Sequence, residues 1–336
     1  MPYLWIILGV IPTAWLMDFM LRLYVAPRIA DIFENNPPFD VSAESPPNAA
    51  ELISIPTADG LTLTGSLVLP EFETPRGLVI FFPELNGNHA MSVRYCAGLL
   101  KAGFALLGFD FRNQGVSDKQ EEYDPIHWIT EYELRDVEAV MEYVESHPQL
   151  ATLPIVSFGV SRGGVAAIIA AGRYPRVRAV IADSAFSTHA MTRHFVDRFA
   201  KFIIPQWLFR YLPEIHIRGA LRDAMQISQR RRNCTYLHME DELPASLNTP
   251  MLLISGLSDS YVRPDLARHV HRVCGDAAEL WLVENAKHNK AREQQPEEYD
   301  RRVVDHVAQA LPDAFEQPES ADDASDSPLR ADIATS

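Results

Sequence analysis

The chain has 336 residues, 47% of them apolar, and a formal net charge of −15. The negative charge argues against a nucleic-acid-binding surface, and the apolar fraction is ample for the core of one large α/β unit. The three cysteines lie far apart and match no metal-binding spacing, so we expect buried thiols and no disulfide framework.

Residues 1–33 contain a long apolar segment. Residues 3–17 carry no charge, and further apolar residues follow them, interrupted only by Asp18 and Arg22. Roughly 20 apolar residues span a bilayer, and the two charged residues are four positions apart, so on a helix they can pair. The sequence therefore predicts an uncleaved, single-pass transmembrane helix over residues 3–25 that anchors the protein in a membrane.

Two other interpretations of this segment stay open: a cleaved secretory signal, and a helix that packs on the protein itself. A signal would need basic residues before its apolar stretch, and no Lys or Arg precedes Arg22. Arg22 and Arg28 instead follow the apolar stretch, so the positive-inside tendency favours a cytoplasmic position for the rest of the chain.

Two further segments differ in composition from a folded domain. Residues 34–49 are rich in proline and are predicted to be a linker. Residues 312–336 contain seven acidic residues, one arginine and almost no large apolar side chain, so we expect an acidic disordered tail. Residues 50–311, which lie between these two segments, should form the folded domain.

Strand and helix patterns alternate through this domain. The domain opens on residues 51–70, which resemble a hairpin with its turn near Asp59-Gly60. The later elements are expected at 77–83 (strand), 92–103 (helix), 104–111 (strand), 130–147 (helix), 153–160 (strand), 163–175 (helix), 177–185, 250–259 and 278–288 (strands). Continuous apolar strands separated by helices predict a parallel sheet covered on both faces, with ligands bound at the carboxyl ends of its strands.

Ser161 stands where one of these strands turns into a helix, in the sequence Gly159-Val-Ser-Arg-Gly163. Small residues two positions before and two after a serine allow the tight turn that lifts its hydroxyl clear of the sheet. The N-terminus of the following helix favours negative charge at the same place. This strand, turn and helix arrangement predicts that Ser161 is a catalytic nucleophile.

A serine nucleophile needs a base, and the base needs an acid to orient it. The expected chain order in this arrangement is Ser, Asp or Glu, His. Asp259 ends one predicted strand and His288 ends the next, and of the eleven histidines His288 alone has this placement. Asp183, which ends the strand after Ser161, remains a second possible acid.

Several motifs together resemble the α/β-hydrolase superfamily. They are "GVSRGG" at residues 159–164, "FDFRNQGVS" at 109–117, "GLSDSYV" around Asp259 and "AKHN" around His288. The resemblance covers residues 50–311. It is closest to the serine-aminopeptidase-like branch, which includes membrane-anchored acyl-ester and acyl-thioester hydrolases.

The resemblance implies an α/β-hydrolase fold: a mostly parallel eight-stranded sheet, helices on both faces, and a helical lid at residues 186–248 after the sixth strand. It also implies Ser161 as nucleophile, His288 as base and Asp259 as the acid that orients it. The lid sequence is rich in aromatic and basic residues. Such a lid packs on its own domain, or it offers an apolar wall for an acyl group or a surface that touches a membrane.

The sequence departs from the family where the oxyanion hole is expected. The family usually carries His-Gly after the third strand, and this chain has Pro83-Glu84. The backbone N–H groups of Leu85 and Arg162 would then hold the oxyanion. A carboxylate at Glu84 opposes an oxyanion unless it turns away or is paired, so Glu84 is also a possible substrate-site residue.

The sequence thus predicts a serine hydrolase that cleaves an acyl ester or thioester through an acyl-enzyme on Ser161. The substrate would be a small or lipid-like acyl compound, and no metal or organic cofactor is implied. Two alternatives stay open: a peptidase of the same branch, and a catalytically silent hydrolase-fold protein that binds a partner at the membrane.

Overall fold

The computed structural model describes residues 2–34, 44–46, 50–243 and 248–316, with side chains from Ile11 onward in the first helix. Most of the predicted linker and of the acidic tail therefore lies outside the described residues. The strands are β1 Glu51–Pro56, β2 Thr62–Val68, β3 Gly77–Phe82, β4 Phe104–Phe109, β5 Ile155–Val160, β6 Val177–Asp183, β7 Met251–Gly256 and β8 Ala278–Val283. The helices are α1 Pro2–Glu34, α2 Met91–Tyr95, α3 Ala97–Lys101, α4 Glu131–Ser146, α5 Arg162–Arg173, α6 Thr188–Phe199, η1 Ala200–Phe202, α7 Gln206–Phe209, α8 Glu214–Arg231, α9 Met239–Glu242, α10 Pro264–Cys274, η2 Gly275–Ala277, α11 Ala291–Gln294, α12 Pro296–Ala310 and α13 Pro312–Phe315.

The eight strands form one sheet in the order β1-β2-β4-β3-β5-β6-β7-β8. β2 pairs antiparallel with both β1 and β4, and the remaining neighbours are parallel. The parallel strands β3 to β7 are short apolar runs because both of their faces are buried, whereas the edge strand β8 is partly exposed. All parallel strands end at the same edge of the sheet, so the loops that follow them meet there.

Side chains of one strand alternate between two apolar cores. On β3, Leu78, Ile80 and Phe82 join the core that also contains residues of α4, α5 and α10. Val79 and Phe81 point the other way, into the core shared with α2, α3 and α12. This alternation follows from the two-residue period of a strand. The sheet therefore has helices on both faces, as the resemblance predicts.

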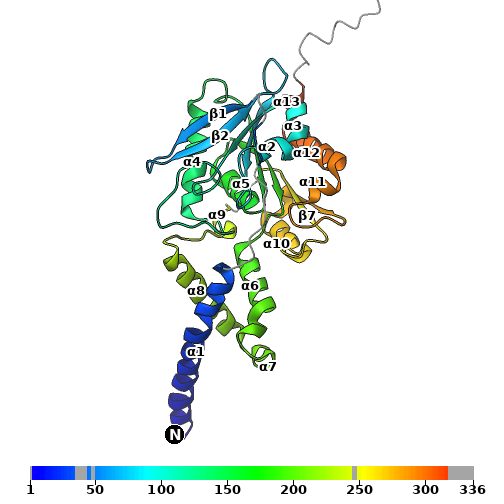
Figure 1. Ribbon diagram of the computed structural model, residues 1–336. Helices are drawn as coiled ribbons and strands as arrows, with labels where there is room; N and C mark the ends of the chain where they lie inside the picture. The colour runs from blue at the N-terminus through cyan, green and yellow to red at the C-terminus, as the bar shows by residue number, and fades with distance from the viewer. Residues whose placement is uncertain (1, 35–43, 47–49, 244–247, 317–336) are drawn as a thin grey trace, which may run out of the picture.

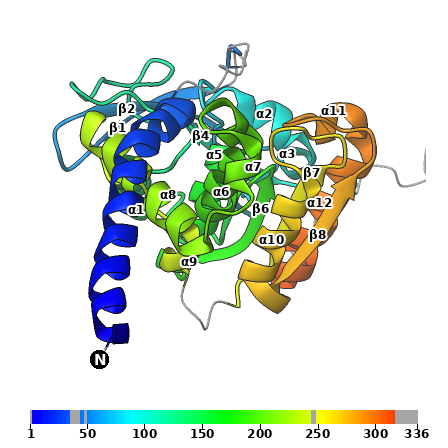
Figure 2. The ribbon, with the colours of Figure 1, turned by 90° about the horizontal axis from the view of Figure 1, so that it is seen from below.

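A helical lid lies between β6 and β7. It contains α6, η1, α7, α8 and α9, and in Figure 1 its longer helices α6 and α8 extend away from the sheet domain. Helix α1 runs beside α8 in both Figure 1 and Figure 2, so the first helix of the chain and the lid form one helical layer. This lid follows the sixth strand, at the position expected from the sequence.

The last turns of α1, from Val25 to Phe33, are part of the protein core. Val25 and Ile29 are each only 5% exposed, and Phe33 is fully buried. The Phe33 ring meets the rings of Trp128 and Phe195 at centroid distances of 6.2 and 6.3 Å. The apolar residues of this stretch are therefore explained by packing on the lid and the main domain.

The charged residues of α1 are also used within the protein. Asp18 accepts hydrogen bonds from Arg22 (2.8 Å) and from His216 of α8, and Arg22 also donates to Asp223 of α8 (3.0 Å). Among the described residues, no helix combines the length and the apolar character needed to cross a membrane. The prediction of a transmembrane helix, of membrane contact through residues 3–25 and of an anchored localisation is therefore wrong. The sequence suggested only that Asp18 and Arg22 pair with each other, whereas both also bind residues of α8.

Candidate active site

The turn that carries Ser161 has a strained backbone. Ser161 follows β5 directly and has φ +52° and ψ −116°, a conformation that side-chain-bearing residues rarely adopt. A Cβ on Gly159 would lie 2.1 Å from the carbonyl oxygen of Gly163, and one on Gly163 would lie 2.0 Å from that of Phe82. Both positions therefore require glycine, which is why the serine is flanked by glycines at these two places.

Ser161, His288 and Asp259 form one hydrogen-bonded line. The Ser161 hydroxyl lies 3.0 Å from His288 Nε2, and His288 Nδ1 lies 2.7 Å from Asp259 Oδ2. The three side chains follow the carboxyl ends of β5, β8 and β7. Because these strands run parallel in one sheet, residues up to 127 positions apart in sequence meet at one edge.

The environment of Asp259 fixes the proton on the histidine. Asp259 Oδ1 accepts from the backbone N–H groups of Tyr261 (2.7 Å) and Val262 (2.8 Å), which leaves Oδ2 for His288. Since a carboxylate oxygen accepts, the Nδ1–H of His288 donates to Asp259, and Nε2 is the acceptor that faces the Ser161 hydroxyl. This is the tautomer that a general base needs.

Asp183, the second possible acid, has other partners. Its carboxylate accepts from the hydroxyl groups of Ser184 (2.9 Å) and Tyr299 (3.0 Å). Burial raises the pKa of Asp183, and the two hydrogen bonds act to lower it. Burial has the larger effect, so the pKa is about 6. His288 forms its described carboxylate contact with Asp259, so the geometry favours Asp259 as the orienting acid.

Glu84 is buried beside the histidine loop. It is 6% exposed, and its carboxylate accepts a hydrogen bond from the side-chain amide of Asn289, the residue after His288. Burial raises the pKa of Glu84, while the neighbouring His288 and the Asn289 amide act to lower it. The carboxylate is therefore paired with the histidine loop, a contact that sequence reasoning missed.

The candidate oxyanion groups lie at the start of α5 and after β3. Arg162 opens α5, and its buried guanidinium donates to the Ile126 carbonyl (2.9 Å) and to Glu133 (2.7 Å). These bonds of the Arg162 side chain hold the first turn of α5 in place. The backbone N–H of Arg162 lies at the N-terminus of this helix. Leu85 lies in a tight turn in which Gly87 N donates to the carbonyl of Glu84 (2.9 Å).

Aromatic rings cover the site on the lid side. The Tyr261 ring packs on His288 at a centroid distance of 5.1 Å, and Phe195 of α6 packs on Tyr261 at 5.9 Å. His127 meets both rings, and burial lowers its pKa to about 3, so it is neutral near pH 7. Ser161 is only 6% exposed, so little of its side chain is open to solvent in this conformation. Phe195 and His127 lie in none of the motifs found in the sequence, and Tyr261 lies in the motif around Asp259 without having been singled out there.

Comparisons with known proteins agree with this architecture. A family model for the alpha/beta hydrolase fold matches residues 77–216. Two Mycobacterium tuberculosis proteins, one from each of two strains, carry the provisional name phosphoribosyl transferase and are 33% identical to the chain over 144 residues. The match covers 42% of this chain and 31% of each relative, so the chain spans about a third of the length of these curated relatives.

Solved structures resemble the chain over most of its length. An esterase of Pyrococcus furiosus has a TM-score of 0.57 at 21% identity and covers 82% of this chain and 97% of its own. An alpha/beta hydrolase from Penicillium sp. sh18 has a TM-score of 0.56 at 18% identity, covering 78% of this chain and 99% of its own. Est1E of Butyrivibrio proteoclasticus, solved with ferulic acid, has a TM-score of 0.53 at 19% identity, covering 76% and 99%.

The family model and these structures together give the chain an α/β-hydrolase fold, which confirms the predicted fold. They support the α/β-hydrolase superfamily and do not distinguish its branches.

Proposed function

We propose that this chain is a serine hydrolase that cleaves an acyl ester or thioester through an acyl-enzyme on Ser161. The observation that carries the proposal is the continuous hydrogen-bonded line from Ser161 through His288 to Asp259 at the strained turn. A serine, a base and an orienting acid within hydrogen-bond distance are the parts that nucleophilic acyl transfer requires.

The reaction has two steps. Ser161 Oγ attacks the substrate carbonyl while His288 Nε2 takes the hydroxyl proton, and His288 then returns this proton to the leaving alcohol or thiol. Water enters next, gives a proton to His288, and its oxygen attacks the acyl-enzyme carbonyl. Proton return to Ser161 Oγ releases the carboxylic acid, and Asp259 stabilises the imidazolium in both steps.

The oxyanion formed in each step would be held by the backbone N–H groups of Arg162 and Leu85. The N-terminus of α5 adds its partial positive charge at the same place. One such donor is worth on the order of 3 kcal/mol of transition-state stabilisation. The pairing of Glu84 with Asn289 supports this arrangement, because a carboxylate held by the histidine loop is not free to occupy the oxyanion position.

Ester chemistry is favoured over peptide chemistry by the similar structures. The Pyrococcus furiosus protein is an esterase, and Est1E binds the aromatic acid ferulic acid. These two structures support the proposal of an ester substrate. Because both are less than 25% identical to the chain, they do not identify which ester it is. The motifs around Asp259 and His288 keep the serine-aminopeptidase-like branch as the proposed position within the superfamily.

A substrate panel tests the proposal. Purified full-length protein and its Ser161→Ala variant are assayed on p-nitrophenyl acetate, butyrate and octanoate, on an acyl thioester, and on an aminoacyl anilide. We expect turnover of at least one ester or thioester that Ser161→Ala loses. Turnover of the anilide alone would favour a peptidase. Equal rates for both proteins on every substrate would contradict the proposal.

A further inference from the structure

The helix that follows Ser161 lacks the usual features that hold a first turn in place. Helix α5 begins at Arg162 and continues with Gly163 and Gly164, and only proline favours a helix less than glycine does. The first turn contains no acidic residue, and the Ser161 side chain makes no capping bond to its described backbone. The backbone N–H of Arg162, which would hold the oxyanion, belongs to this turn. Contacts from outside the turn must therefore help to fix its direction.

The Arg162 side chain provides such a contact. Arg162 and Glu133 of α4 are both fully buried, and a 2.7 Å ion pair joins the guanidinium Nη2 to the carboxylate Oε1. Nη1 of the same guanidinium donates to the carbonyl of Ile126 at 2.9 Å. Two bonds from one planar group leave the side chain little freedom to rotate. Because the Cβ and the backbone nitrogen share one Cα atom, this restraint also limits rotation of the peptide plane that carries the N–H.

Glu133 is itself held firmly at the start of α4. Its Oε2 accepts from the backbone N–H (2.8 Å) and the hydroxyl (2.6 Å) of Thr130, the residue that caps this helix. Its Oε1 also accepts from the Tyr123 hydroxyl at 2.5 Å. With the bond from Arg162, the carboxylate accepts four hydrogen bonds. Glu133 is therefore a fixed partner for the guanidinium.

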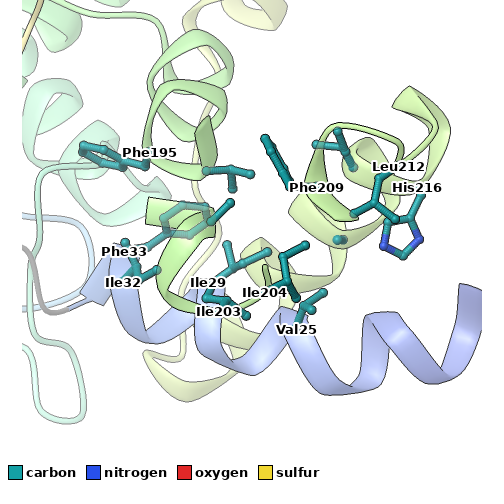
Figure 3. Close-up of a pocket in the computed structure, with 14 residues that line it drawn as sticks. Val25, Ile29, Ile32, Phe33, Phe195, Ile203, Ile204, Phe209, Leu212 and His216 are labelled. Atoms are coloured by element: carbon teal, nitrogen blue, oxygen red, sulfur yellow. The ribbon is translucent and has the colours of Figure 1, made fainter. Parts of the chain in front are cut away.

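The segment that contains Ile126 is also fixed. Trp128 is fully buried, and its ring meets the rings of Phe33 of α1 and Phe195 of α6, each at a centroid distance of 6.2 Å. Figure 3 shows Phe33 and Phe195 next to each other at one end of the apolar contact between the first helix and the lid. A packed cluster thus supports the carbonyl that accepts from Arg162, so both bonds of the guanidinium have well-held acceptors.

Stability alone does not explain a buried ion pair at this place. Burying two charges costs about as much as their attraction returns, and apolar side chains of similar size often stabilise a protein equally well or better. The pair does give a defined direction, because the planar guanidinium donates along fixed axes. An oxyanion donor needs such a direction, since it lowers the barrier only when it is aimed in advance at the developing charge.

We propose that Glu133 is a positioning residue of the oxyanion hole, and that it acts through the buried Arg162 side chain on the direction of the Arg162 N–H. The proposal rests on the function proposed above, in which this N–H holds the oxyanion. Glu133 lies in none of the motifs found in the sequence. Without the pair, the N–H is still present but less well aimed, so binding of the transition state should weaken more than binding of the substrate.

A double variant and a matched control separate this role from a general loss of an ion pair. Arg162→Met/Glu133→Gln removes the pair without leaving one buried charge alone, and it keeps the backbone N–H. Arg173→Met/Glu242→Gln removes a 2.6 Å ion pair at the other end of the same helix. Arg162→Lys keeps the charge but not the planar, two-sided bonding, and it replaces the double variant if the latter does not fold.

Inhibition by phenylboronic acid measures the effect. Ser161 Oγ adds to its boron, and the tetrahedral adduct places an oxygen where the oxyanion would lie, so its Ki reports on the oxyanion donors. The Ki does not depend on the fraction of folded protein, which the final extent of fluorophosphonate labelling counts separately. We expect the Ki to rise about 10- to 100-fold in the double variant at full labelling. It should rise at least about twofold in Arg162→Lys and stay unchanged in the control.

The two proposals fail in different ways. If the unaltered protein is neither labelled nor inhibited, Ser161 is not an activated nucleophile, and both proposals are overturned. If the unaltered protein is inhibited and the fully labelled double variant, or Arg162→Lys in its place, has the same Ki, the role of Glu133 is overturned while the proposed function stands. An equal rise of the Ki in the control would also overturn this role, because α5 would then respond to the loss of any ion pair.

Discussion

The side-chain amide of Asn289 donates a hydrogen bond to the buried carboxylate of Glu84, 205 residues earlier in the chain. Asn289 directly follows His288, so this contact joins the loop of the proposed base to the segment that would supply an oxyanion donor. Glu84 is also the residue at which the chain departs from the family pattern. We therefore interpret Glu84 as a positioning residue whose charge also acts on His288.

Glu84→Gln should shift the acid limb of the pH profile. An ionised Glu84 beside His288 stabilises the positively charged imidazolium. Glutamine keeps the size and the hydrogen-bonding capacity but removes the charge. The acid limb of kcat/KM should therefore move to lower pH if Glu84 is ionised over that range.

Profiles of both proteins on the best ester substrate provide the measurement. A purely structural role would lower kcat at every pH without moving the limb. A lower kcat with an unchanged midpoint of the acid limb would therefore show that the charge of Glu84 has no electrostatic effect on the base.

Asp259 and Asp183 should differ strongly in their effect on catalysis. Asp259→Asn removes the acceptor for His288 Nδ1, so we expect kcat to fall by on the order of 10³- to 10⁴-fold. Asp183→Asn is the matched control, because its carboxylate binds Ser184 and Tyr299 instead. Its kcat should change by less than about tenfold. Steady-state kinetics measures both effects. A larger loss of kcat in Asp183→Asn than in Asp259→Asn would show that the acid is Asp183.

Asp183 should make folding stability depend on pH. Burial raises its pKa from 3.8 to about 6, so the folded state holds the proton more tightly than the unfolded state does. The stabilisation is complete below about pH 4 and is lost as the pH rises through 6, a change of roughly 3 kcal/mol. Asparagine imitates the protonated form and should remove this loss. Urea unfolding of the unaltered protein and of Asp183→Asn at several pH values between 4 and 7 measures the difference. Parallel curves would mean that this carboxyl is not buried as described.

The stretch of α1 from Val25 to Phe33 should contribute to folding stability, and the exposed Phe19 before it should not. Phe33 is fully buried against Trp128 and Phe195, so Phe33→Ala should lower the free energy of unfolding by about 3–5 kcal/mol. Phe19 lies on the same helix but is 51% exposed, so Phe19→Ala should change the free energy of unfolding by about 0.5 kcal/mol or less. Chemical denaturation of both variants tests this. Similar effects at the two positions would argue against the packing of α1 on the lid.

The sequence predicted the features that depend on local pattern. Ser161 could be found because its turn needs Gly159 and Gly163, and Asp259 and His288 because both follow apolar strands that end at the same edge. The parallel sheet followed from the same alternation of apolar strands and helices. Each of these inferences needs only short-range sequence information and a general rule of chain topology.

The features that the sequence did not predict depend on long-range contacts. Asp18 and Arg22 looked like a pair near a membrane interface, because their partners on α8 lie some 200 residues away. The bond between Glu84 and Asn289 spans 205 residues, and the ring contacts of Tyr261 also join separate segments of the chain. A single sequence shows which residues are apolar or charged, but it does not show which surface will cover them.

The most direct test of the account is covalent labelling of Ser161. A fluorophosphonate reacts with a serine only when a base activates its hydroxyl, so labelling reports the line from Ser161 through His288 to Asp259 without knowledge of the substrate. The full-length protein is treated with the probe, digested, and its labelled peptide is identified by mass spectrometry, with Ser161→Ala and His288→Ala treated in parallel. We predict one modification, on Ser161, that is lost in both variants. Absence of labelling in the folded protein, or labelling that persists in Ser161→Ala, would contradict the proposed nucleophile.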